Sequence, residues 1–429
     1  MATDGPTRKG FGPPKPGDVL HYEQLVGEWP TRFHLRVDPD GGGMLMANAS
    51  EAAALSPVGV LMAHGILEGR GIEAISADVK RAFRDVSNER IIADLSLVQQ
   101  IIDDLAAPGD NYPISNLGGA GATEWERQLS APLRADIVQT DADTAREIMR
   151  RLWDVGVPHA NIMVDPRADT SQVRAIVEAA EDIGMIAGMR TVASWVSPEL
   201  IGDAAMAGLD HLDVLYLSDE VAIHDALAGD GDHARALAAF EQCRELELCP
   251  VAQVAIVDDN AWVLDDVAES LAERGVVNVV FYALACLNDD AEADAAGALP
   301  ARSLPQVAVI MEEAADDLFG RYLWAPPVRY NPARSLVEQV CAGPRTAGDI
   351  AVRIEADGSV LPPRGPATCA GNILTDPWAR IWGNQCFTRY RERLKAPVHT
   401  CDCPELQIHA VDCPQDPQSW SYDEAGGAR

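Results

Sequence analysis

The sequence has no cysteine before Cys243, only four lysines, and no apolar run of the roughly 18 residues needed to cross a membrane. Its start lacks the apolar segment of a secretory signal, so we expect a cytoplasmic protein in a reducing compartment. Nine cysteines, an odd number in a chain of 429 residues, do not indicate a disulfide framework. Clustered thiols are instead candidate ligands for a metal ion or an iron–sulfur cluster.

Positive charge is also scarce, because 34 Lys and Arg residues face 66 Asp and Glu residues, for a formal net charge of −32. This charge repels phosphate backbones and anionic lipids, so we expect neither nucleic acid nor membrane as a partner. The basic residues are nearly all arginine, and the acidic surface is typical of a halophilic protein. A GC-rich genome would produce the same arginine bias.

The length predicts two or three domains. Residues 1–18 form a Pro- and Gly-rich segment that predicts a flexible tail. Apolar alternation from Phe33 to Val37 resumes at Met44 after a Gly-rich turn, which predicts a hairpin. Helical patterns follow, at 58–67, 72–83 and 89–105. A small winged-helix-like domain is therefore expected over 19–110.

Short apolar strands alternate with helices from 125 to 325. A parallel sheet is the usual product of this rhythm, and we predict an α/β fold, a partial (β/α)6 TIM-like barrel. Its ligand site would lie at the carboxyl ends of the strands. The predicted strands are 134–139, 160–164, 184–189, 212–217, 250–256 and 277–283, and the predicted helices between them are 142–154, 168–183, 197–207, 234–246 and 260–274.

A third region, 330–420, holds six of the nine cysteines and few long periodic runs. Cys341 is followed by an alternating strand near 350–354, then by Asp357-Gly358 and Val360. The remaining motifs, in order, are Cys369-Ala-Gly371-Asn372-Ile373, Trp378, Ile381-Trp382, Arg389 and the cysteines Cys401, Cys403 and Cys413. This order resembles the SPASM auxiliary-cluster domain of radical S-adenosylmethionine (SAM) enzymes, and it predicts a Cys-rich SPASM-like domain.

The resemblance extends to the rest of the chain. The six βα units, with Leu217-Ser218-Asp219 after the fourth strand, are similar to the radical SAM partial barrel. The first region is similar to the peptide-recognition winged helix of pyrroloquinoline quinone biosynthesis, a module that also precedes the barrel in haem-pathway members. The resemblance implies a peptide or a tetrapyrrole as ligand, or an active radical SAM enzyme as partner.

The departures from the family pattern concern its cofactor. The family holds a four-iron cluster with a CxxxCxxC loop after the first strand, and the open iron binds SAM. Here Thr140-Asp141 leads directly into the helix at 142, with no cysteine nearby. The family's Gly-Gly-Glu-Pro at the second strand is Met163-Val164-Asp165-Pro166, so side chains replace the open backbone. We therefore expect no radical SAM cluster and no reductive cleavage of SAM.

The C-terminal cysteines leave three alternatives open. Pro363 replaces one expected ligand, yet the remaining thiols could hold one iron–sulfur cluster. With His399 and His409 nearby they could equally form a zinc site, and the third alternative is that they bind nothing. The candidate metal ligands are Cys341, Cys369, Cys401, Cys403 and Cys413.

Three polar residues at the expected strand ends are candidate ligand-binding residues: Asp165, Asp219 and His224. Asp165 precedes a proline, a position more typical of a turn or cap, and His224 with Asp225 is more typical of packing or capping. The leading hypothesis is a pseudo-enzyme, a non-catalytic partner in haem, tetrapyrrole or peptide-derived cofactor maturation. The alternative is an enzyme of another class that uses these residues or a C-terminal metal site.

Overall fold

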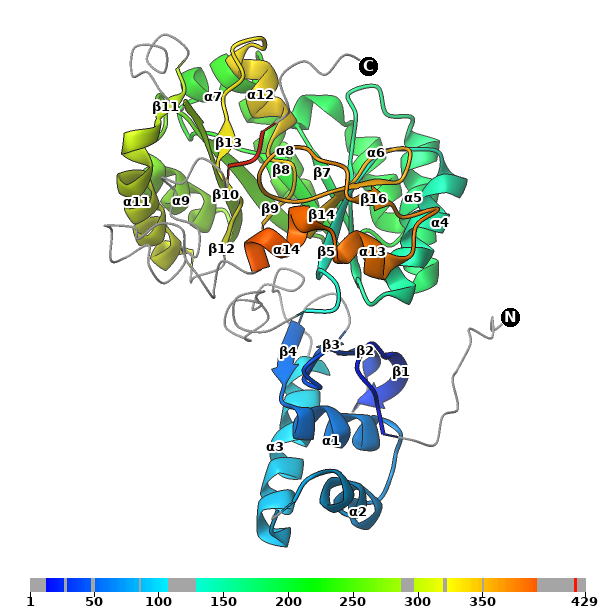
Figure 1. The fold of residues 1–429 in the computed structure, drawn as a ribbon. Helices are drawn as coiled ribbons and strands as arrows, with labels where there is room; N and C mark the ends of the chain where they lie inside the picture. Colours follow the sequence, from blue (N-terminus) through cyan, green and yellow to red (C-terminus); the bar gives the residue numbers. More distant parts are fainter. Residues whose placement is uncertain are drawn as a thin grey trace. The chain divides into compact units, whose positions relative to one another are not determined.

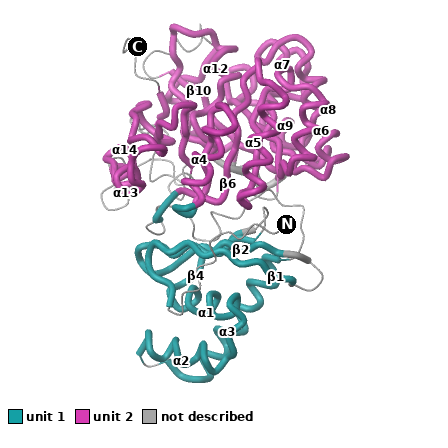
Figure 2. The backbone as a smooth tube through the Cα atoms, turned by 90° about the vertical axis from the view of Figure 1, so that its right-hand side faces the viewer, with its two compact units in different colours: residues 1–131, 154–156 teal, residues 132–153, 157–429 magenta. Residues whose placement is uncertain are grey.

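The computed structural model describes residues 13–26, 29–47, 51–84, 86–106, 129–286, 297–318, 322–348, 351–391 and 420–422. The chain divides into two compact units (Figure 2). Unit 1 comprises residues 1–131 and 154–156, and unit 2 comprises residues 132–153 and 157–429. The C-terminal region that we expected as a separate domain at 330–420 therefore belongs to unit 2.

Unit 1 is an antiparallel sheet of order β1-β2-β3-β4 followed by three helices. The expected hairpin is confirmed as the β2–β3 pair, with Leu35 opposite Leu45. The outer strands were not predicted, because polar residues such as Glu23 and Gln24 interrupt the alternation in β1. The elements are β1 (Val19–Val26), β2 (Trp29–Val37), β3 (Gly43–Ala47), β4 (Glu51–Leu55), α1 (Pro57–Leu67), α2 (Ile72–Ala82) and α3 (Asn88–Ala106).

The helices of unit 1 begin and pack as their sequences require. Ser56 accepts a hydrogen bond from the Gly59 N–H at 3.2 Å, and Pro57 occupies the first turn, so the start of α1 is capped. The apolar face of α3, including Ile91, Leu95 and Ile102, is buried in the same core as the inward-facing sheet residues.

The centre of unit 2 is a parallel sheet of six consecutive strands, with the helices that follow the strands around it (Figure 1). All six predicted strands are present, and the sheet order follows the sequence order from β5 to β10. The strands are β5 (Arg134–Val138), β6 (His159–Met163), β7 (Ile186–Thr191), β8 (His211–Leu215), β9 (Cys249–Ile256) and β10 (Asn278–Cys286).

The helices between these strands begin and end at local signals. Asp169 caps α5 by accepting from the Ser171 N–H at 2.8 Å, and Gly184, with φ 89°, ends that helix in a left-handed conformation. Of the helices that connect these six strands, the sequence patterns missed only the short α7. The helices are α4 (Ala142–Asp154), α5 (Thr170–Ile183), α6 (Pro198–Met206), α7 (Val221–Ala228), α8 (Asp232–Glu245), α9 (Leu264–Glu273) and α11 (Leu304–Asp317).

The C-terminal region extends the same sheet. Strand β14 (Ala351–Ile354) pairs in parallel with β5, with Ala351 opposite Arg134, and covers an edge that would otherwise be open. Short strands β11 (Leu299–Pro300), β12 (Tyr322–Trp324) and β13 (Val328–Arg329) pair with β10 at the other edge. The remaining elements are α12 (Leu336–Ala342), β15 (Ser359–Leu361), β16 (Gly371–Asn372), α13 (Trp378–Trp382) and α14 (Gln385–Arg391).

Among the residues that the structure describes, we find no helix with the length and apolar character needed to span a bilayer.

Candidate functional site

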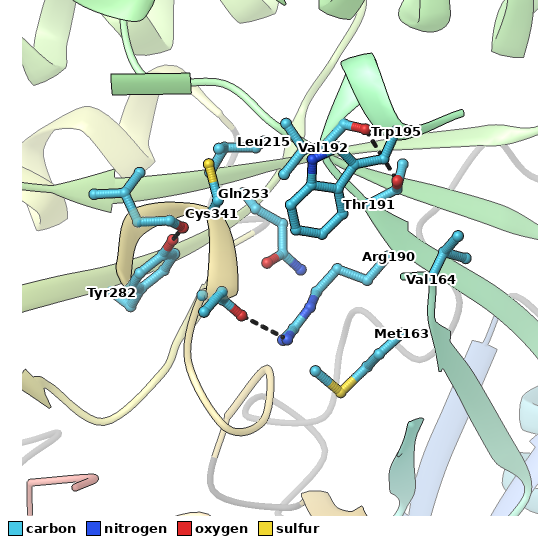
Figure 3. Close-up of a pocket in the computed structure, with 13 residues that line it drawn as sticks. Met163, Val164, Arg190, Thr191, Val192, Trp195, Leu215, Gln253, Tyr282 and Cys341 are labelled. Carbon is cyan, nitrogen blue, oxygen red and sulfur yellow. Dashed lines mark hydrogen bonds between the residues drawn. The ribbon is translucent and has the colours of Figure 1, made fainter. Parts of the chain in front are cut away.

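A small cavity of about 60 Å³ lies at the carboxyl ends of β6, β7 and β8, where α12 approaches the sheet (Figure 3). Its polar side chains are Arg190, Thr191, Gln253 and Tyr282, and Trp195 forms an aromatic wall. The other residues that line it are Met163, Val164, Val192, Leu215, Val340, Cys341, Ala342 and Gly343. The expected position of a ligand site, at the strand ends, thus coincides with this cavity.

The connection between β5 and α4 consists of only Gln139, Thr140 and Asp141. Gln139 donates to the Gln172 side chain at 3.0 Å, and Gln172 in turn donates to the Thr140 carbonyl at 2.9 Å. Asp141 accepts from the Thr144 N–H at 3.0 Å and so caps α4. A tight, hydrogen-bonded turn therefore occupies the place where the family has a cysteine-bearing loop.

The end of β6 is also filled by side chains. Met163 and Val164 both line the cavity, and Val164 is buried. The Val164 N–H donates to the Arg190 carbonyl at 3.0 Å, so this backbone is engaged with the neighbouring strand. The side chains expected to replace the family's two glycines are thus found inside the site.

Main chain from the C-terminal region covers the strand ends. The Tyr282 hydroxyl donates to the Val340 carbonyl at 2.8 Å. Arg190 donates to the carbonyl oxygens of Ala342, at 3.2 Å, and Pro344, at 3.0 Å. The Ala347 N–H donates to Asp136 at 2.8 Å. Side chains of three sheet strands, β5, β7 and β10, therefore hold the segment 340–347 over the sheet.

Closer to the amino ends of the strands lies a buried polar network. Arg134 donates to both Asp136 and Asp213 at 2.8 Å. His211 Nδ1 lies 2.6 Å from Asp213, and the Nε2 atoms of His159 and His211 lie 2.7 Å apart. Asn161 and Gln253 each donate to Asp213 at 3.2 Å. All seven side chains are buried, and Asp213 is fully so.

The network controls the ionisation of its members. Burial alone would raise the pKa of the Asp213 carboxyl, but the charges of His211 and Arg134 and their hydrogen bonds outweigh it and hold that pKa below its usual range. Burial, the Arg134 charge and His211 lower the pKa of His159 well below its usual value. Asp213 is therefore held ionised and His159 neutral.

The two candidate metal ligands that the structure describes lie in different settings. Burial, with a smaller effect of Asp232, raises the pKa of the Cys341 thiol to about 11, and the thiol donates to the Leu227 carbonyl at 3.8 Å. Cys369 is exposed and donates to the Gly371 carbonyl at 3.4 Å. Cys401, Cys403 and Cys413 lie outside the described residues, as do His399 and His409. Within the described ranges, no three His, Cys, Asp or Glu side chains are arranged to hold a metal ion.

The other candidate residues do not line the cavity. His224 is fully buried, accepts from the Leu217 N–H at 3.1 Å through Nδ1, and lies 3.0 Å from Asp232 through Nε2. Both ring nitrogens are thus engaged, and His224 offers neither to a ligand. Asp165 accepts from the Arg167 N–H at 2.9 Å in an exposed turn. Asp219 is exposed.

Sequence reasoning missed the buried residues Arg190 and Tyr282 and the whole polar network. A signal was present, because Arg134 and Asp136 stand two positions apart within one short apolar strand, as do His211 and Asp213 within another. Two residues apart along a strand share a face, so such pairs mark a polar face inside a buried sheet.

Comparison with known proteins gives two groups of matches. The PqqA peptide cyclase of Bradyrhizobium diazoefficiens is 24% identical over 288 residues, 63% of this chain and 73% of that protein. The PqqA peptide cyclase of Rhodopseudomonas palustris is 27% identical over 316 residues, 69% of this chain and 75% of that protein. No protein-family model matches the sequence.

Among solved structures, Streptococcus suis SuiB bound to S-adenosylmethionine has a TM-score of 0.52 at 12% identity, covering 91% of this chain and 98% of SuiB. The fold is that of the radical SAM enzymes. SuiB bound to its precursor peptide SuiA has a TM-score of 0.50 at 11% identity, covering 93% of this chain and 94% of SuiB. The radical SAM resemblance is supported by both comparisons, and the relatives found are peptide cyclases.

The residues at the strand ends do not fit the cluster and SAM of such enzymes. The β5–α4 turn offers Gln139, Thr140 and Asp141 in place of three thiolates. The cavity of about 60 Å³ is also far smaller than the roughly 300–1,000 Å³ of typical small-molecule sites. The described residues at the strand ends therefore offer neither the thiolates for that cluster nor the room for SAM.

Proposed function

We propose that this chain is a non-catalytic protein of radical SAM fold that binds a peptide and acts beside an active radical SAM enzyme. One observation carries the proposal: β5 and α4 are joined by three residues without a cysteine. Three thiolates hold the cluster in the family, and the open iron is where SAM binds. Without that loop the chain has no means of starting the radical reaction.

Two further features support the loss of catalysis. Met163 and Val164 occupy the strand end where the family has glycines, and hydrogen bonds from Arg190 and Tyr282 hold main chain of 340–347 over the same site. Side chains and main chain of the protein thus fill the space that a cofactor occupies in the family. A chain that had only lost its cysteines would be expected to retain an open, cofactor-sized cavity.

A peptide is favoured over a tetrapyrrole as the ligand. The curated relatives are peptide cyclases, and SuiB has been solved with a precursor peptide. Unit 1 supplies a suitable element, since β4 is an edge of its sheet among the described strands and α3 lies against β3 and β4. An extended peptide can add to such an edge through main-chain hydrogen bonds.

A cluster or a zinc ion in the C-terminal region remains part of the proposal, with a smaller ligand set. Cys341 leaves that set because its thiol lines the cavity at the strand ends and donates to the Leu227 carbonyl at 3.8 Å. The proposed ligands are Cys369, Cys401, Cys403 and Cys413. Iron, sulfide and zinc analysis of anaerobically purified protein tests this, and the metal content is expected to fall in a Cys401→Ala/Cys403→Ala variant but not in Cys341→Ala.

The non-catalytic role is tested with the full-length protein after anaerobic cluster reconstitution. We expect no reductive cleavage of SAM with dithionite and no saturable SAM binding by calorimetry. The PqqA peptide cyclase of Bradyrhizobium diazoefficiens, treated identically, serves as the positive control. Cleavage above the background of a reaction without protein would overturn the proposal.

Peptide binding is tested by hydrogen exchange with synthetic PqqA peptide as the first probe. Protection is expected at Glu51–Leu55 of β4 and absent at Val19–Val26 of β1, an edge strand of the same sheet that serves as an internal control. Adding the chain to the cyclase and its peptide should change cyclase turnover. Equal protection at both edges, or none with unaltered turnover, would contradict the peptide-presenting role.

A further inference from the structure

The Arg190 side chain is a buried cation without a carboxylate partner. It is 7% exposed, and its two hydrogen bonds go to the neutral carbonyl oxygens of Ala342 and Pro344. Within the part of the chain that the structure describes, no carboxylate lies within ion-pair distance of its guanidinium. Burying a charge without an opposite charge is costly, which makes Arg190 a candidate ligand-binding residue.

Charged groups of both signs lie around Arg190. Burial lowers its pKa, the nearby Asp136 carboxylate opposes this shift, and the charges of Arg353 and Arg134 reinforce it. Asp136 already accepts hydrogen bonds from Arg134 and from the Ala347 N–H, while Arg353 pairs with Glu355 at 2.7 Å. These neighbouring charges are thus engaged with partners of their own, and the Arg190 guanidinium is the charged group that borders the cavity.

The cavity beside Arg190 has room for a small group and walls of mixed character. Arg190, Gln253 and Trp195 project toward it from different strands and loops (Figure 3). Val164, Val192 and Leu215 supply buried apolar walls. Met163, Trp195 and Cys341 are partly exposed, so the cavity has a route to solvent. Its volume of about 60 Å³ suits a group of a few atoms.

We propose that this cavity binds the carboxylate group of a small molecule or of a peptide end, with Arg190 as the anchoring cation. A carboxylate is planar and carries one negative charge, which matches one planar guanidinium. A phosphate dianion would call for a second cation or several N–H donors, and Arg190 is the only cation among the described residues that line the cavity. The assignment does not depend on the function proposed above.

Arg190 also has a structural role that must be separated from binding. Its hydrogen bond to Ala342 lies at the end of α12, where a cation stabilises the helix carbonyls. A purely structural role predicts that substitution lowers stability regardless of the anion present. An anion site predicts a stability gain that depends on the anion, because a ligand that binds only the folded state stabilises it by mass action.

The test uses full-length protein at constant ionic strength with sodium acetate, N-acetylglycine, sodium phosphate or sodium chloride. We expect Tm to rise with acetate or N-acetylglycine concentration, relative to chloride, and the apparent affinity to fall at least tenfold in Arg190→Gln. Arg190→Lys should retain part of the response. Arg167→Gln, which changes an exposed arginine on the neighbouring β6–α5 connection, should behave as wild type.

A second measurement covers the case in which Arg190→Gln does not fold. Trp195 borders the cavity, so acetate should change the tryptophan fluorescence of the wild type, and this change should disappear in Trp195→Phe. The proposal is overturned if carboxylates act no differently from chloride, or if Arg190→Gln responds as the wild type does. A response to phosphate that exceeds the response to acetate would reject the carboxylate assignment in favour of phosphate.

Discussion

The parallel sheet of unit 2 buries charged side chains at two levels, a lower level near the amino ends of its strands and an upper level at their carboxyl ends. Near the amino ends of the strands, Asp213 receives hydrogen bonds from Arg134 and two side-chain amides and lies 2.6 Å from His211, so this buried carboxylate is well satisfied. At the carboxyl ends, the Arg190 guanidinium donates its hydrogen bonds to the neutral carbonyl oxygens of Ala342 and Pro344. The arginine of the lower level is thus paired with carboxylates, whereas the arginine of the upper level borders a cavity.

On the proposal made above, the lower level serves stability and the upper level serves binding. A buried network whose members are all paired contributes order, but removing one member leaves the others uncompensated. A cation that borders a cavity at the strand ends is stabilised when an anion binds beside it. In parallel α/β folds the carboxyl ends of the strands are also where ligands bind, so both arguments place binding at the same level.

The largest effect on stability should come from changing Asp213, the residue at the centre of the lower level. Asp213→Asn keeps the shape but removes the charge that faces Arg134 and His211, and we expect a loss of about 3–5 kcal/mol in the free energy of unfolding. Urea denaturation followed by circular dichroism measures it. Asp219→Asn, at an exposed position after the same strand, should change stability by less than about 0.5 kcal/mol. Similar values for the two variants would show that the network is not essential.

The next effect concerns the space around His211. A methyl group added at Gly188 would lie closer than 3.0 Å to the His211 ring and to the Asn161 carboxamide oxygen. Gly188→Ala should therefore displace His211 from Asp213 and cost about 3 kcal/mol in unfolding free energy. Gly202→Ala, inside α6 with nothing within 4 Å, should instead stabilise by up to about 1 kcal/mol. Equal thermal unfolding of the two variants would contradict the close packing.

A pH effect of intermediate size should follow from His159. The folded state holds this imidazole neutral because its pKa is lowered, whereas the unfolded chain takes up a proton below about pH 6.5. Stability should therefore fall as the pH falls, by up to about 1.4 kcal/mol per pH unit for this group. The slope of unfolding free energy between about pH 6.5 and 5 should decrease in His159→Gln. Parallel slopes would mean that another group is responsible.

The smallest effect belongs to the upper level. Tyr282→Phe removes the hydroxyl that donates to the Val340 carbonyl, and we expect a loss of about 1 kcal/mol. Hydrogen exchange should accelerate in residues 340–347, because one of their attachments to the sheet is gone. Tyr216→Phe is the matched control, since its hydroxyl lies 3.4 Å from Ser270 in a weaker contact elsewhere. Unchanged exchange in 340–347 would argue against that attachment.

Much of the fold could be predicted from the sequence, because apolar periodicity is a local property. The helix expected at 142–154 is observed with those bounds as α4, and all six parallel strands occur where the pattern places them. The pairing of β14 with β5 could not be predicted, since 351–354 and 134–138 are more than two hundred residues apart. Which edge a short strand covers depends on the tertiary contacts of the intervening chain.

Some features of the candidate site could likewise be predicted from the sequence, and others could not. The turn of Gln139, Thr140 and Asp141 and the replacement of two glycines by Met163 and Val164 are legible in the sequence, as they depend on consecutive residues. Candidate ligands chosen by residue type could not be judged from the sequence, because their contacts depend on the tertiary structure. His224 has chemistry suited to a site, yet its position beside Asp232 commits it to the structure.

By itself the sequence determined the strand and helix order, the absence of cysteine near the first parallel strand, and the acidic character of the chain. Only the tertiary structure decided what each buried arginine meets at long range. Arg134 and Arg190 each stand in a short strand among apolar residues, and Arg134 also has Asp136 two positions along its own strand. Arg134 meets Asp213 across the sheet, whereas the segment that reaches Arg190 presents carbonyl oxygens. Electrostatic compensation depends on distance in space, and residues far apart in the chain supply it.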